Sequence, residues 1–126
     1  MLNLILVGCG SFLGGISRYY LGGLILHLTA SHRFPFSTLA VNFLGCFIIG
    51  LIGGLSEQSL VSQNLKLLLI TGFLGGFTTF SAFGYETSFL ARTGASGLAL
   101  ANILCSVGLC LLAVWLGLRV SGIKQW

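Results

Sequence analysis

The sequence predicts an all-α membrane protein with four transmembrane helices, and two observations lead to this fold class. First, only 6 % of the 126 residues are charged while 56 % are hydrophobic, and the mean hydropathy is +1.03. Soluble domains carry about 25 % charged residues. Second, the chain divides into long apolar segments, each near the length of about 20 residues that crosses a bilayer. We therefore expect a single domain, 1–126, in the plasma (inner) membrane.

The four spans are expected at 3–28, 36–55, 65–91 and 98–119. The first has no basic leader and no A-x-A-like cleavage site, so it is expected to be a retained span. The polar turn SHRFP at 31–35 separates it from the second span.

The third span is expected to be broken near 75–79. The stretch TGFLGGFTTFSAF at 71–83 pairs two glycines and follows them with two threonines. Inside lipid, an unwound backbone is tolerated only where protein, water or an ion satisfies its polar groups. Free carbonyl groups suit a hard cation such as Na⁺, whereas the restarted helix presents its positive dipole end. The alternative is a kink without a pore.

The second and fourth spans each carry a narrow polar stripe on an apolar helix. Hydrogen bonding between helices is one explanation, worth about 0.6 kcal/mol on average. The other is a track for an anion, because asparagine offers two N–H donors and serine one O–H. The stripes are Thr38, Asn42 and Gly45 in the second span, and Asn102, Ser106 and Cys110 in the fourth.

Aromatic rings lie directly beyond the expected break. Phe80 and Phe83 are three residues apart and share one helical face. Because aromatic edges carry partial positive charge, these rings could meet a dehydrated anion, although simple packing is the alternative. We expect the hydroxyl groups of Thr79 and Ser81 to contribute to the same site.

Two ionisable residues lie at depth. An ionised Arg18 inside the first span would cost at least about 2.5–3.5 kcal/mol, so it is expected to face a wet vestibule or the protein interior. Glu86 is the acid deep enough to pair with Arg18 or share that vestibule. Alternatively, Arg18 attracts an anion towards a pore mouth.

The basic residues are scattered and nearly balanced across the membrane. Lys66, Arg119 and Lys124 fall on one side, and Arg33 and Arg92 on the other. Orientation follows the Lys/Arg bias of short loops, so this chain could insert both ways up and form an antiparallel dimer. A single, weakly fixed orientation is the alternative. Without a basic cluster, nucleic acid is not an expected partner.

Cysteines and glycines are expected to serve packing. The four cysteines lie in apolar segments without a CxxC pair, which is typical of small apolar residues. Glycine pairs with GxxxG spacing allow helix backbones to approach closely. The pairs are Gly10/Gly14, Gly50/Gly54 and Gly72/Gly76.

Four stretches together resemble the CrcB/Fluc family of fluoride channels over nearly the whole chain. They are GGISRY at 14–19, FPFSTLAVNFLGCFIIG at 34–50, GFLGGFTTFSAF at 72–83, and the N-x-x-x-S of Asn102 and Ser106. The resemblance implies passive, selective F⁻ export by an antiparallel, dual-topology homodimer with two pores in the lipid bilayer. It also implies a structural Na⁺, not transported, on the dimer axis. Residue by residue, the family's Na⁺-binding carbonyls match Gly75 and Thr78, its pore residues match Phe80, Phe83, Asn42, Asn102 and Ser106, and its first-span arginine matches Arg18.

Two other functions remain open. A small proton-coupled multidrug exporter is also a four-span antiparallel dimer, but it needs a titratable carboxylate at depth, a role that falls to Glu86 here. The second alternative function is that of a membrane scaffold that transports nothing. No general base, nucleophile or metal cluster accompanies the polar residues, so an enzyme is not expected.

Overall fold

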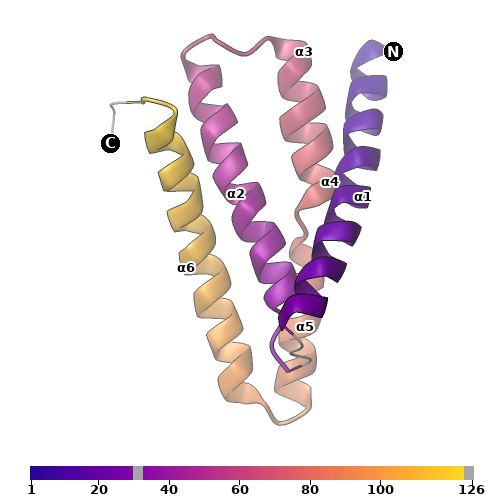
Figure 1. The fold of residues 1–126 in the computed structure, drawn as a ribbon, viewed down its shortest axis with the longest axis vertical. Coiled ribbons are helices and arrows are strands. Elements are labelled where there is room, and N and C mark those ends of the chain that lie inside the picture. Colours follow the sequence, from indigo (N-terminus) through magenta and orange to yellow (C-terminus); the bar gives the residue numbers. More distant parts are fainter. Residues whose placement is uncertain (30–32, 124–126) are drawn as a thin grey trace.

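The computed structural model describes residues 1–29 and 33–123 (Figure 1). Within those ranges the chain forms helices joined by short turns and includes no strand. Four helical segments are long and apolar enough to cross a membrane. They are α1 (Leu2–Thr29), α2 (Phe36–Glu57), a composite segment Gln63–Arg92 and α6 (Ser96–Val120). The prediction of four spans is confirmed. Ser31 and His32 of the expected turn, and Lys124, lie outside the described residues.

The composite third segment consists of four helical pieces. They are α3 (Gln63–Lys66), the π-helical η1 (Leu67–Leu74), α4 (Gly75–Phe77) and α5 (Phe80–Arg92). The Ser62 hydroxyl begins the segment by accepting a hydrogen bond from the Leu65 N–H, as N-cap residues do. Thr78 and Thr79 between α4 and α5 have extended backbone angles.

The described helices are arranged as two pairs. In Figure 1, α2 and α6 lie side by side and run in the same direction, while α1 runs beside η1 and α4. The buried side chains of Val41, Leu74 and Phe77 form the core between α2 and the third segment. This core holds the Thr78–Thr79 interruption against α2.

Glycines set the separation of both helix pairs. A Cβ atom on Gly76 would lie 2.9 Å from Ser11 Cα, and one on Gly10 would lie 2.9 Å from Gly72 Cα. On the other side of the subunit, a Cβ atom on Gly50 would lie 3.0 Å from Val114 Cα. The prediction that the GxxxG glycines allow close helix contact is therefore confirmed for these positions.

Candidate functional site

The interruption at Thr78–Thr79 is held by one side chain from α2. The Asn42 amide nitrogen Nδ2 donates to the Thr79 carbonyl oxygen at 3.1 Å, and the Thr79 N–H donates to Asn42 Oδ1 at 2.8 Å. Asn42 thus supplies both partners that a continuing helix would have provided. Gly45, one turn further along α2, leaves the space that the Thr78 methyl group occupies.

The end of α4 leaves main-chain carbonyl groups without their helical donors, as every helix end does. The Thr79 N–H, four residues beyond Gly75, donates to Asn42 instead. The Ala82 N–H, four residues beyond Thr78, donates to the Thr79 hydroxyl at 3.2 Å. Gly75 is exposed and Thr78 is half-buried.

The start of α5 is capped by Thr79. Besides accepting from the Ala82 N–H, the Thr79 hydroxyl lies 3.1 Å from the Ser81 hydroxyl. A capped helix N-terminus carries partial positive charge and favours anions. Thr79 and Ser81, both expected in the site from the sequence, therefore lie together at this positive end.

Phe80 and Phe83 follow at the beginning of α5. Their ring centroids are 5.3 Å apart and their planes are inclined at 46°. The Phe80 side chain is 81 % exposed on the isolated subunit, while Phe83 is half-buried. Both line a cavity of about 340 Å³ together with Asn42 and Ser106.

Part of each polar stripe lines this cavity: Asn42 and Gly45 from α2, and Ser106 and Cys110 from α6. The close approach of Gly50 to the Val114 backbone fixes how the two helices align. Asn42 lies about two helical turns before Gly50, and Ser106 lies about two turns before Val114. Both side chains line the cavity. Asn42 and Ser106 therefore lie at the same level of the α2–α6 groove, the cavity that Phe80 and Phe83 also line.

Asn102 is 1 % exposed and belongs to a chain of hydrogen bonds between α6 and α5. The Ser106 hydroxyl donates to Asn102 Oδ1 at 3.3 Å, and Asn102 Nδ2 donates to the Thr87 hydroxyl at 2.9 Å. Thr87 in turn donates to the Phe83 carbonyl oxygen at 2.7 Å. Sequence reasoning missed Thr87, although its position four residues after Phe83 places it on the same helical face.

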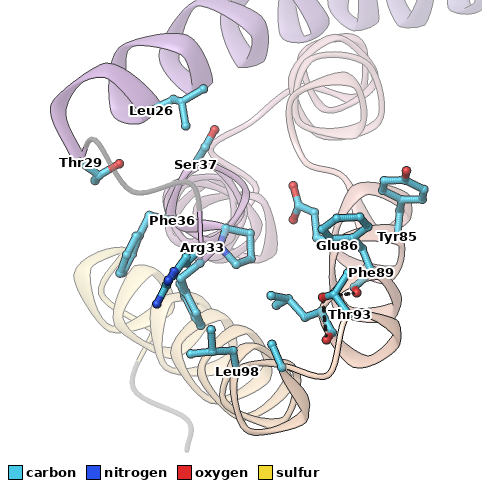
Figure 2. A pocket seen from close by; sticks show the side chains of 14 residues that line it. Leu26, Thr29, Arg33, Phe36, Ser37, Tyr85, Glu86, Phe89, Thr93 and Leu98 are labelled. Carbon is cyan, nitrogen blue, oxygen red and sulfur yellow. Dashed lines mark hydrogen bonds between the residues drawn. The ribbon is translucent and has the colours of Figure 1, made fainter.

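Glu86 lies on the inner side of α5. Its Oε1 accepts a hydrogen bond of 2.6 Å from the Thr38 hydroxyl, while its Oε2 is buried without a partner among the described residues. Glu86 also lines a cavity of about 610 Å³ that it shares with Arg33. Figure 2 shows the Glu86 carboxyl group on the α5 side of this cavity and Arg33 near the start of α2.

Arg18 lies elsewhere in the subunit. It is half-buried and lines a different cavity, of about 840 Å³, with Tyr19 and Tyr20. Across the two described ranges of the chain, no ion pair joins Arg18 to Glu86, and the two line separate cavities. Within one subunit, therefore, the two residues do not form the pair considered from the sequence.

The sequence of the whole site matches one known family. A family model described as CrcB-like protein, Camphor Resistance (CrcB), matches residues 5–118. The chain belongs to the CrcB-like protein family. The matched CrcB-like region includes both polar stripes, the Thr78–Thr79 interruption and the phenylalanines beside it.

Among curated CrcB-like relatives, several carry the name fluoride-specific ion channel FluC. The protein of Methylobacillus flagellatus is 43 % identical over 121 residues, covering 95 % of this chain and 94 % of the relative. That of Pelobacter propionicus is 50 % identical over 105 residues, covering 82 % and 81 %. That of Geotalea uraniireducens is 50 % identical over 110 residues, covering 86 % and 88 %.

Proposed function

We propose that this multi-pass membrane protein is a fluoride channel that lets F⁻ leave the cytoplasm passively across the plasma (inner) membrane. The single observation that carries the proposal is the α2–α6 groove, where the polar side chains of Asn42 and Ser106 line the same cavity as Phe80 and Phe83. The choice of fluoride among anions follows from the names of the relatives.

The groove offers what a dehydrated anion needs. Fluoride is small and strongly hydrated, so a selective path must replace its water with donors and still release it. Asn42 Nδ2 has two hydrogens, of which one is used at the Thr79 carbonyl oxygen. Its second hydrogen and the edges of Phe80 and Phe83 provide weak, successive contacts. The Ser106 hydroxyl would add a donor by turning away from Asn102 Oδ1, to which it donates in this structure. Such contacts favour conduction over tight binding.

We propose that two copies of the chain assemble antiparallel, each in the opposite membrane orientation. The support is twofold. The Phe80 ring, 81 % exposed, extends out of its own subunit beside the groove. The basic residues are also nearly balanced between the two membrane sides, which suits insertion both ways up. A second copy would then complete the wall of each groove.

A structural Na⁺ fits the residues at the interruption. The carbonyl oxygens of Gly75 and Thr78 have lost their helical donors, and hard cations prefer oxygen ligands of this kind. Both residues lie at or near the surface on which we place the second copy. We propose that they would hold Na⁺ between the two subunits and that the ion would not be transported.

The function is tested by fluoride efflux from liposomes containing the purified protein, followed with a fluoride electrode. We expect F⁻ release without comparable Cl⁻ release. Phe80→Ile is expected to lower F⁻ efflux at least about tenfold because the ring edges are lost, which corresponds to about 1.4 kcal/mol. Phe12→Ile, which removes another exposed ring on α1, is the matched control. Undiminished efflux in Phe80→Ile would exclude the ring-edge contact, and absence of efflux from the unmodified protein would favour a scaffold.

The cation is tested by assembling the protein without Na⁺, in an organic cation buffer. We expect a smaller dimer fraction and lower F⁻ efflux than after assembly in Na⁺. A dimer that forms and conducts equally well without Na⁺ would contradict a sodium site.

A further inference from the structure

Two cysteines occupy the next position along the α2–α6 groove. Counting back one turn from Gly50 and Val114, the pair whose backbones are in close contact, leads to Cys46 and Cys110. Both thiols line the cavity of about 340 Å³. They are unoxidised, so a facing dithiol lies one turn beyond Asn42 and Ser106.

The surroundings of this pair restrict what it can bind. None of the residues lining the cavity, all within the described ranges, carries a charged side chain. An isolated thiolate would be costly to bury there. A divalent soft ion bound by two thiolates forms a complex without net charge, and thiolate ligands select soft metal ions.

The number of ligands restricts the metal further. Structural zinc sites use four protein ligands. Over the residues that the structure describes, no group of three or more His, Cys, Asp or Glu side chains is placed to hold a metal ion. Two facing thiols instead suit a thiophilic ion that is stable with two ligands, as Hg²⁺ is.

We propose that Cys46 and Cys110 form a two-thiol site for a soft, thiophilic divalent metal ion in the α2–α6 groove. Binding replaces two S–H bonds with two S–metal bonds and releases two protons, without any change in oxidation state. The bound ion would occupy the groove beside Asn42 and Ser106, and would therefore obstruct fluoride. This obstruction rests on the proposed function, whereas the binding does not.

Binding is tested with Hg²⁺ on purified protein carrying Cys9→Ser and Cys105→Ser, so that only the facing pair remains. We expect sulfur-to-mercury charge-transfer absorbance and, by native mass spectrometry, one Hg²⁺ per subunit with loss of two protons. Adding Cys46→Ser or Cys110→Ser leaves one thiol. Because the second thiol of a pair binds intramolecularly, we expect retention of Hg²⁺ against a competing monothiol to fall at least about tenfold in either variant. Equal retention by the pair and the single-thiol proteins would overturn the site.

The obstruction is tested by comparing each protein's fluoride efflux with and without Hg²⁺. We expect Hg²⁺ to lower efflux in the protein with both thiols and to have at least about tenfold less effect in either single-thiol variant. Retained Hg²⁺ with unchanged efflux would overturn the obstruction but not the site. If the metal-free protein releases no fluoride, the proposed function fails, while the retention measurement still decides the site. Should Cys110→Ser fail to give a monodisperse protein, Cys110→Ala serves in its place.

Discussion

Replacing Asn42 with alanine tests whether this side chain holds the interruption together. The substitution removes two hydrogen bonds, of 3.1 and 2.8 Å, to the Thr79 main chain. Each is worth about 0.5–1.5 kcal/mol, so local opening at Thr79 becomes easier by about 1–3 kcal/mol. That difference corresponds to about 5- to 150-fold faster exchange of the Thr79 amide hydrogen.

The assay is amide hydrogen exchange by NMR on the protein in detergent micelles. Thr38→Ala is the matched control, because Thr38 lies one turn away on the same stripe but bonds to Glu86. The buried Ala113 amide on α6 reports global unfolding. The reasoning is refuted if Thr79 exchanges no faster in Asn42→Ala than in Thr38→Ala. It is also refuted if Thr79 exchange accelerates by no more than that of Ala113.

Two further predictions concern transport and packing. Glu86→Gln is expected to retain measurable fluoride efflux from liposomes, because the proposed channel needs no proton carrier; complete loss together with proton-dependent drug transport would favour the exporter. Gly50→Ala is expected to lower the free energy of unfolding in micelles by about 1–3 kcal/mol, since its Cβ atom would collide with the Val114 backbone. Gly53→Ala, where nothing lies within 4 Å of the added atom, is the control, and an equal loss in both variants would contradict the packing argument.

The four spans were predictable because bilayer thickness fixes their length and hydropathy fixes their composition. The close helix contacts at Gly10 and Gly50 were equally readable from GxxxG spacing. The π-helical geometry of η1 was not predictable, because the mostly apolar run Leu67–Leu74 fits α- and π-helical hydrogen bonding alike.

The site was predictable as a set of residues but not as a set of partners. Helical spacing placed Asn42 on a polar stripe. That spacing does not predict the two hydrogen bonds between the Asn42 amide and the Thr79 main chain. From the sequence, Glu86 was expected either to pair with Arg18 or to share a vestibule with it, because both are charged and deep. The structure instead gives Glu86 a neutral partner, Thr38, since which face of α5 meets α2 depends on tertiary packing.

The same interruption suits both the proposed cation and the proposed anion because breaking a helix exposes two different sets of groups. Carbonyl oxygens remain at the end of α4, including those of Gly75 and Thr78, and N–H groups remain at the start of α5. Thr79 lies between these carbonyl and N–H groups. Its own N–H and carbonyl oxygen are both hydrogen-bonded to Asn42, so neither is free. Acceptors and donors are thereby separated along the chain. The proposed fixed cation beside α4 and the proposed moving anion beside Phe80 then need not compete for the same atoms.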